Sequence, residues 1–236
     1  MTDFKKNRIP HHYYYKPDKW KKIKKIKNIL LFALYLASVI IIVNLTNGNR
    51  LRNVYANNKS FYYFSDNISD KEFISSLNFQ DKLKIKFLEE YIGNKEIAYF
   101  SYKYSKLNNI EPELLVAIMK VESNFNPKAI NYNRNGTIDR GLCQLNNVVF
   151  SNLTLKDFFD IETNIKYGSQ FIKWCLDQSQ NNLIKALAMY NAGVGNVLNT
   201  KVGERTLNYI EKIINEKEDI KIGIENYLNE NRDLLN

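Results

Sequence analysis

The chain has 236 residues, a net charge of +9 and a hydrophobic fraction of 44%, enough for one packed domain with additions. Its nine Gly, its four Pro and the lack of a repeat of roughly 20–50 residues argue against an all-β protein and a solenoid. Residues 1–28 hold ten Lys and Arg against two Asp. The excess charge therefore lies in a short tail rather than on a domain surface, and we expect no nucleic-acid partner.

Residues 29–46 form an apolar segment that we predict to be a transmembrane anchor. No residue from Asn28 to Asn49 is charged, and a helix of that length would reach about 33 Å, enough to cross a membrane. Residues 1–28 then form a basic cytoplasmic tail. The positive-inside rule places the rest of the chain on the outer, periplasmic side of a bacterial inner membrane. A buried core helix and a cleaved signal peptide are the alternatives, but the length of the segment and the missing small-residue cleavage site favour an uncleaved anchor.

Residues 47–93 are predicted to connect this anchor to the main domain. The part from 47 to 69 is polar and aromatic without a clear period, which is typical of a stalk. Between Asp70 and Tyr91 the apolar residues recur at helical spacing and predict one or two amphipathic helices, with Ser69 or Asp70 as the first cap.

Residues 94–236 are predicted to form an all-α, or mainly α, domain of short helices. One helix is expected over 95–107, and a second begins at Pro112 and ends near Ser123, before Asn126-Pro127. An Asn-rich loop is expected over 128–140, and no strand alternation of convincing length is present. Further helices are expected over 141–149, 162–178, 181–191 and 204–217.

Glu122 is the first candidate for chemistry, because it ends an apolar helix. Ile118 and Met119 precede it by one turn, and Phe125 follows it. Apolar surroundings disfavour a charged carboxylate, so the pKa of Glu122 is expected to rise. A carboxyl that stays protonated near neutral pH can donate a proton to a glycosidic oxygen. Taken alone, however, a glutamate at a helix end is more often an exposed residue without a catalytic role.

Four short motifs decide the interpretation of Glu122. They are Val121-Glu122-Ser123-Asn124-Phe125-Asn126-Pro127, Gly141-Leu142-Cys143-Gln144-Leu145-Asn146, Ala188-Met189-Tyr190-Asn191-Ala192-Gly193 and Thr206-Leu207-Asn208-Tyr209-Ile210. In this order they resemble the soluble lytic transglycosylase (SLT) family, whose pattern is Glu-Ser-x-Phe-x-Pro, Gly-Leu-Met-Gln, Ala-Tyr-Asn-Ala-Gly and Glu-Thr-x-x-Tyr-Val. The resemblance covers about residues 95–215 and implies a goose-type lysozyme-like fold.

The resemblance implies a role for each matching residue. Glu122 matches the catalytic acid/base. The predicted substrate-binding residues are Ser123, Gly141, Gln144, Tyr190, Asn191 and Tyr209. Within this set Gly141 is expected to allow close backbone approach, Asn191 to bind an N-acetyl group and Tyr209 to lie near the catalytic carboxyl. Ser123 is also compatible with a purely structural role.

Three residues depart from the family pattern. Cys143 replaces the usual Met, Met189 replaces Ala, and Arg205 stands where a Glu usually precedes Thr206. The acid stays in place, so these departures concern the shape of one cleft wall. Cys143 and the second cysteine, Cys175, are compatible with a disulfide, but their apolar surroundings favour buried free thiols.

No metal or organic cofactor is expected. The segment from Asn131 to Asp139 has oxygen-bearing residues at alternate positions, as in a calcium loop, but Leu142 stands where the bidentate Glu should be. An Asn-rich turn held by side-chain hydrogen bonds is therefore favoured.

The resemblance predicts a peptidoglycan lytic transglycosylase. Such an enzyme cleaves the β-1,4 bond between N-acetylmuramic acid and N-acetylglucosamine and leaves a 1,6-anhydro end. The expected partners are glycan strands, the inner membrane through residues 29–46 and, because relatives often open the wall for them, secretion or flagellar machinery. The alternatives are a hydrolytic lysozyme of the same fold, with Asp139 as second carboxylate, and a non-catalytic peptidoglycan-binding scaffold.

Overall fold

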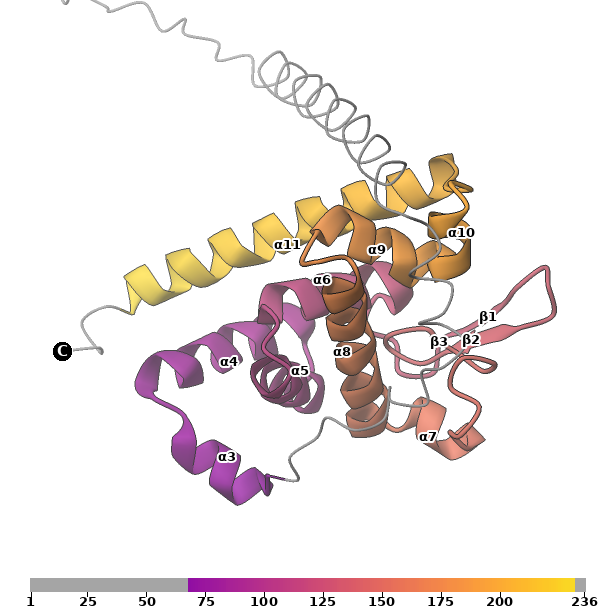
Figure 1. Cartoon of the computed structure of the whole chain (residues 1–236). Coiled ribbons are helices and arrows are strands. Elements are labelled where there is room, and N and C mark those ends of the chain that lie inside the picture. The colour runs from indigo at the N-terminus through magenta and orange to yellow at the C-terminus, as the bar shows by residue number, and fades with distance from the viewer. Residues whose placement is uncertain (1–67, 232–236) are drawn as a thin grey trace, which may run out of the picture. The chain divides into compact units, whose positions relative to one another are not determined.

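The structure, a computed structural model, describes residues 68–231. Within this range the chain forms nine α-helices and one small sheet, so the prediction of a mainly helical protein is confirmed (Figure 1). None of the helices in the described range is both long and apolar enough to cross a membrane. The predicted basic tail, the predicted anchor at 29–46 and most of the predicted stalk lie outside the described residues.

Two capped helices begin the described chain. α3 (Asp70–Ser76) starts at a capping box between Ser69 and Glu72, and α4 (Phe79–Ile92) starts at one between Asn78 and Asp81. Each box satisfies backbone N–H groups that the first helical turn leaves without partners. The prediction of one or two helices over this segment is therefore confirmed, because the segment contains two helices. α4 packs against α5 (Lys95–Leu107) and against the last helix of the chain.

The core is built around α6 (Pro112–Ser123), whose residues from Leu114 to Met119 are all buried. α11 (Glu204–Glu230) packs along α6, and α8 (Ile161–Gln178) packs against α5 and α9 (Leu183–Ala192). This packing buries the middle of α6 and leaves its two ends partly accessible, and Glu122 lies at the C-terminal end.

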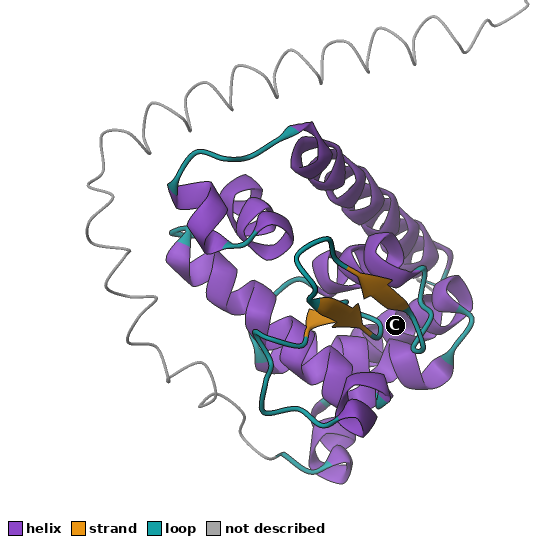
Figure 2. Cartoon of the chain, turned by 90° about the vertical axis from the view of Figure 1, so that its right-hand side faces the viewer, coloured by secondary structure: helices purple, strands orange, loops and turns teal. Residues whose placement is uncertain are grey.

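A three-stranded antiparallel sheet lies to one side of the helices (Figures 1 and 2). Its strands are β1 (Ile130–Tyr132), β2 (Ile138–Arg140) and β3 (Leu145–Asn146). The prediction of a structureless loop over 128–140 is thus wrong. The register pairs Asp139 with Asn131 on one side and with Asn146 on the other. Residues that face each other across a ladder share one face of the sheet, which brings these three polar side chains together.

The helix predicted over 141–149 is absent, and turns and β3 occupy this segment. Gly141 has a φ of 77° and Gln144 a φ of 48°, and neither value is compatible with a right-handed helix. The amide N–H of Cys143 also donates to the side chain of Asn164 rather than to a helical carbonyl.

The last part of the chain is more helical than predicted. α7 (Leu155–Phe159) and α10 (Val194–Leu198) are short helices that the sequence did not predict. α11 reaches Glu230 instead of ending near residue 217. Its distal half packs on α4, where Gly223 permits contact, since a Cβ at this position would lie 2.5 Å from Cζ of Phe87.

Candidate active site

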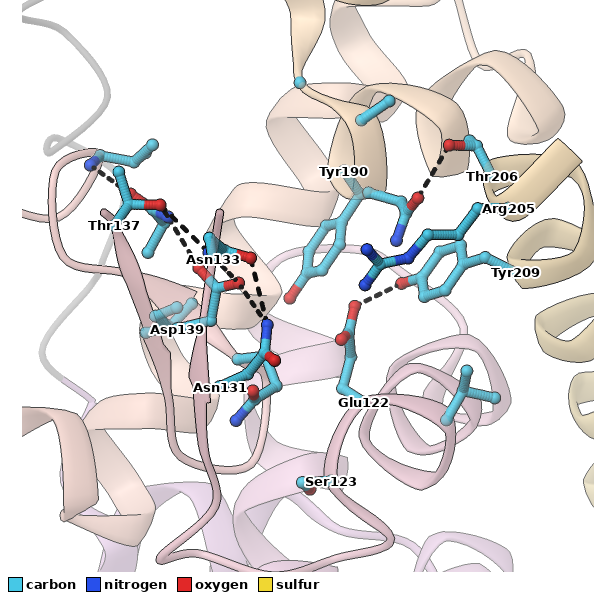
Figure 3. A pocket seen from close by; sticks show the side chains of 18 of the residues that line it. Glu122, Ser123, Asn131, Asn133, Thr137, Asp139, Tyr190, Arg205, Thr206 and Tyr209 are labelled. Carbon is cyan, nitrogen blue, oxygen red and sulfur yellow. Dashed lines mark hydrogen bonds between the residues drawn. The ribbon is translucent and has the colours of Figure 1, made fainter. Parts of the chain in front are cut away.

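A cleft of about 1550 Å³ lies between the C-terminal end of α6, the sheet, and the segment from α9 to α11 (Figure 3). Pockets for single small molecules typically measure roughly 300–1,000 Å³, so this cleft suits a segment of a longer ligand. Residues from all four sequence motifs line it, including Glu122, Gln144, Tyr190 and Tyr209. The fold therefore brings together side chains that are far apart in the chain, such as Glu122 and Tyr209, which are separated by 87 positions.

Glu122 is placed by the way in which α6 ends. Asn124 and Phe125 both have left-handed backbone conformations, with φ of 50° and 61°, and they turn the chain away directly after the carboxyl. The side chain of Glu122 points into the cleft, where the hydroxyl of Tyr209 donates a hydrogen bond of 2.8 Å to Oε1 (Figure 3). Tyr209 belongs to α11, so two packed helices hold the two partners of this bond.

The pKa of the Glu122 carboxyl is raised from 4.5 to about 7. Burial is the main cause, because a poorly solvated carboxyl disfavours its charged form. The hydrogen bond from Tyr209 acts in the opposite direction. The negative charge of Asp139 raises the pKa further, and the positive charge of Arg205 lowers it. The rise that the apolar sequence context predicted is therefore confirmed, and the carboxyl is poised for proton transfer near neutral pH.

The third motif forms the cleft wall next to α11. The hydroxyl of Tyr190 donates to the backbone oxygen of Cys143 at 2.9 Å, and its ring packs against Phe171 with 4.9 Å between the centroids. Asn191 also lines the cleft, and its Oδ1 accepts a 3.0 Å hydrogen bond from the hydroxyl of Thr206. This bond orients the amide, so that Nδ2 is the group of Asn191 that can donate to a ligand.

The other predicted substrate-binding residues have different environments. Gln144 lines the cleft, and its Nε2 donates to the backbone oxygens of Gly141 at 2.9 Å and Ala129 at 3.3 Å. Ser123 lies at the margin of the cleft, apart from the Glu122 carboxyl, and its hydroxyl donates to the backbone oxygen of Met119 (Figure 3).

Gly141 is buried and is not among the residues that line the cleft. The predicted reason for a glycine here, close approach of a glycan to the backbone, is therefore wrong. A Cβ at this position would lie 2.2 Å from Nδ2 of Asn164 and 2.3 Å from the backbone oxygen of Phe158. Together with the φ of 77°, this makes Gly141 a requirement of the fold.

The sheet provides the opposite wall of the cleft, which sequence analysis largely missed. Asp139 accepts hydrogen bonds from three amides, at 2.7 Å from Asn133, 2.7 Å from Asn146 and 3.5 Å from Asn131 (Figure 3). Thr137 joins this network through bonds from Asn133 and Asn146 to its hydroxyl. The signal in the sequence was the polar residue at every second position from 131 to 139, since alternate residues of a strand share one face.

Neither the network nor the cysteines form an evident metal site. Within residues 68–231 no group of three or more His, Cys, Asp or Glu side chains is arranged to hold a metal ion. Cys143 and Cys175 are both free and buried, so the interpretation as thiols rather than a disulfide is confirmed. Cys143 packs against Gly168, where a Cβ would lie 2.3 Å from its Sγ.

Cationic side chains also line the cleft. They are Lys120, Arg134, Lys201, Arg205 and Lys212. Of these, sequence analysis singled out only Arg205, as a departure from the family pattern. Its guanidinium lies beside Tyr209, on the same side of the cleft as the Glu122 carboxyl (Figure 3).

A poorly solvated carboxyl with a pKa near 7, hydrogen-bonded by one hydroxyl in a large cleft, is an arrangement suited to general acid/base catalysis. Comparison with known proteins indicates the family that this region resembles. Residues 99–213 match the family model described as the transglycosylase SLT domain.

The relatives of known sequence are similar over part of their length. A membrane-bound lytic murein transglycosylase F from Pasteurella multocida is 32% identical over 94 residues, covering 37% of this chain and 18% of the relative. The invasion protein IagB from Salmonella typhimurium is 54% identical over 41 residues, covering 17% of this chain and 26% of the relative. The chain thus spans about a fifth to a quarter of these two relatives.

Among solved structures, an inactive mutant of the lytic transglycosylase Slt from Pseudomonas aeruginosa matches with 19% identity and a TM-score of 0.46. This match covers 64% of the present chain and 27% of that one.

Proposed function

We propose that this protein is a peptidoglycan lytic transglycosylase with Glu122 as its only acid/base. The observation that carries the proposal is the Glu122 carboxyl, whose pKa is raised to about 7 inside a polymer-sized cleft of an SLT-family domain. A group with this pKa is substantially protonated at neutral pH and is equally able to take a proton back.

In the first step, protonated Glu122 donates its proton to the oxygen between N-acetylmuramic acid and N-acetylglucosamine. The bond from this oxygen to C1 of the muramic residue breaks, and the N-acetylglucosamine leaves with a new hydroxyl group. Because Tyr209 donates to Oε1, the oxygen of Glu122 that remains for the glycan is Oε2. The substrate's own N-acetyl group stabilises the positive charge that develops at C1, and Nδ2 of Asn191 would donate a hydrogen bond to orient it.

In the second step, the Glu122 carboxylate takes the proton of the muramic 6-hydroxyl, and the 6-oxygen attacks C1. This closes a 1,6-anhydro ring, restores the protonated acid and consumes no water. A nucleophile within the same sugar has a large advantage over a free molecule, because its translational entropy is already lost.

Hydrolysis is the second candidate, because Asp139 lines the same cleft and its charge reaches Glu122. In that reaction Asp139 would position a water. A carboxylate offers about four lone-pair sites, and three amides already occupy Asp139. This occupancy favours an electrostatic role for Asp139. A non-catalytic scaffold is the remaining alternative, and the raised pKa of Glu122 argues against it.

The test is product analysis. The full chain, purified in a mild detergent, is incubated with peptidoglycan, and the released muropeptides are examined by mass spectrometry. We expect 1,6-anhydro ends that borohydride cannot reduce. Reducible ends would replace transglycosylation by hydrolysis and make Asp139 the next residue to test. Binding to glycan without any release would favour the scaffold.

We also propose that residues 29–46 anchor the protein in the inner membrane, with the N-terminus in the cytoplasm and the SLT domain in the periplasm. The lysine-rich residues 1–28 support this orientation. Protease added outside spheroplasts should degrade the SLT domain and spare the first 50 or so residues. A protected SLT domain would refute this topology. Service to a secretion system or flagellum, rather than general wall turnover, stays a prediction.

A further inference from the structure

The turn that follows Glu122 has an unfavourable backbone conformation. Asn124 and Phe125 are consecutive non-glycine residues with φ of 50° and 61°. Left-handed conformations are unfavourable for residues other than glycine, and only Asn or Asp offset this by local hydrogen bonding. The Phe125 side chain cannot form such a bond. Its N–H donates to the backbone oxygen of Met119 at 3.4 Å, and packing of its ring adds support from elsewhere in the fold.

Two side chains pack on the ring of Phe125. The ring of Tyr91, on α4, meets it edge to face at 6.0 Å between centroids, with an interplanar angle of 81°. The ammonium of Lys120 lies 5.4 Å from the centroid of the Phe125 ring, within the range of a cation–π interaction. Lys120 belongs to the helix that carries Glu122, whereas Tyr91 reaches Phe125 from another helix, α4.

Tyr91 is in turn fixed by another residue of α4 and by the distal half of α11, taken here as residues 216–230. Its ring stacks on Phe87 at 6.0 Å, and Phe87 meets Tyr227 at 5.8 Å. The hydroxyl of Tyr91 donates to Glu216. Both segments lie outside residues 99–213, which match the SLT family. The rings of Tyr227, Phe87 and Tyr91 form an aromatic row that connects the helices flanking the SLT region with the turn after Glu122.

Helix α11 thereby holds the catalytic segment at two points. Tyr209 binds the Glu122 carboxyl directly, and Glu216 acts through Tyr91 on Phe125. Residues seven positions apart lie on one face of a helix, two turns from each other, so Tyr209 and Glu216 face the same side. The first bond orients the carboxyl, and the second fixes the backbone from which it projects.

We propose that Tyr91 is a positioning residue for Glu122, and that α4 and the distal half of α11 form a support for the catalytic turn that the matched SLT region does not contain. This inference rests on the proposed function of Glu122 as acid/base. Tyr91 itself is not among the residues that line the cleft.

The test compares three variants of the full chain. Tyr91→Leu removes the ring and the hydroxyl, and Tyr91→Phe keeps the ring but loses the bond to Glu216. Tyr104→Leu is the matched control. Tyr104 is also a helical tyrosine that donates to a glutamate, Glu162, at 2.6 Å, but neither residue lines the cleft. The readouts are kcat and KM for anhydro-muropeptide release, the melting temperature, and the titration of the Glu122 carboxyl followed by carbon-13 NMR.

We expect Tyr91→Leu to lower kcat about 10- to 100-fold, because small displacements of a catalytic group cost that much, and to change KM less than about threefold. The Glu122 titration should move from about 7 toward 4.5 as water reaches the loosened carboxyl. Tyr91→Phe keeps the ring on Phe125 but loses the bond to Glu216, so it should lower kcat by less than Tyr91→Leu does. Tyr104→Leu should melt at a lower temperature, with kcat and the titration unchanged while it is folded.

Equal kcat and equal titration in Tyr91→Leu and the wild type, both folded, would overturn the inference. So would parallel changes in the Tyr91→Leu and Tyr104→Leu proteins. If the wild type releases no glycan, the proposed function fails, but the Glu122 titration in the same variants still decides whether Tyr91 positions the carboxyl.

Discussion

Replacing Glu122 by Gln should abolish activity and, at alkaline pH, stabilise the fold. Gln matches Glu in size, and its side-chain oxygen can still accept the hydrogen bond from Tyr209. It cannot donate an acidic proton, and general acid catalysis alone contributes about 10²- to 10⁴-fold. Because the proposed mechanism uses Glu122 as both acid and base, we expect a loss of at least this size, while the variant still binds glycan strands.

The effect on stability follows from the pKa. A carboxyl whose pKa rises from 4.5 in the unfolded chain to about 7 in the fold favours its protonated form in the folded state. Between these values the folded protein holds more protons than the unfolded one, so stability falls as the pH rises through this window. The cost is absent below pH 4.5 and reaches about 3 kcal/mol above pH 7.

Glu122→Gln removes this cost. Its melting temperature should equal that of the wild type at pH 4 and exceed it by several degrees at pH 8, since about 1 kcal/mol corresponds to 2–4 °C in a domain of this size. Scanning calorimetry at the two pH values measures the difference. The control is Glu111→Gln at the opposite end of α6, which loses an exposed ion pair with Lys217. Such a pair contributes less than about 1 kcal/mol, so activity should remain nearly complete.

Either of two results would refute this reasoning. One is release of anhydro products by Glu122→Gln at a rate comparable to the wild type. The other is loss of activity together with a lower melting temperature at pH 8, which would make Glu122 a structural residue and restore the scaffold interpretation.

The remaining predictions concern the groups around Glu122. Tyr209→Phe removes a bond that lowers the Glu122 pKa, so the alkaline limb of the pH–kcat profile should move to higher pH and the rate should fall about tenfold or more. Asp139→Asn should move this limb to lower pH while anhydro products persist; a switch in product would contradict it. Arg205→Ala should move the limb to higher pH. A shift in the same direction as in Asp139→Asn would disprove that the two charges have opposite effects on the Glu122 pKa. Gly141→Ala should lower the unfolding free energy by about 2 kcal/mol or more, as urea denaturation measures, because its Cβ has no space.

The helices around the core could be predicted because their signals are local. The bounds of α5, Lys95–Leu107, and of α6, Pro112–Ser123, are those expected from the sequence. Asn94 caps α5, and Pro112 begins α6 where a missing N–H costs nothing. Both helices carry apolar residues at helical spacing, so the hydrophobic pattern and the residues that begin each helix predict the same bounds.

The segment after residue 140 could not be predicted, because distant partners determine its shape. Its short apolar run favoured a helix. Instead, Oδ1 of Asn164 accepts a hydrogen bond from the backbone N–H of Cys143. Its Nδ2 donates to the backbone oxygens of Arg140 and Phe158. Nothing in the local sequence shows that a buried amide 21 positions later will bind this backbone. The extension of α11 has a similar origin, because Gly223 becomes favourable only where Phe87 packs against it.

The sequence predicted which residues form the helical side of the candidate site, but not which charges set the pKa of Glu122. The four motifs named the residues that line the helical side of the cleft, yet the pKa of Glu122 depends on two charges that no motif relates to it. Asp139 raises this pKa from the sheet, and Arg205 lowers it from α11. The family pattern has a Glu at the position of Arg205, and a second negative charge there would add to the effect of Asp139. Arginine instead offsets Asp139, so the balance of these two side chains, together with burial, sets the pH range in which Glu122 would perform its proposed role as acid and then as base.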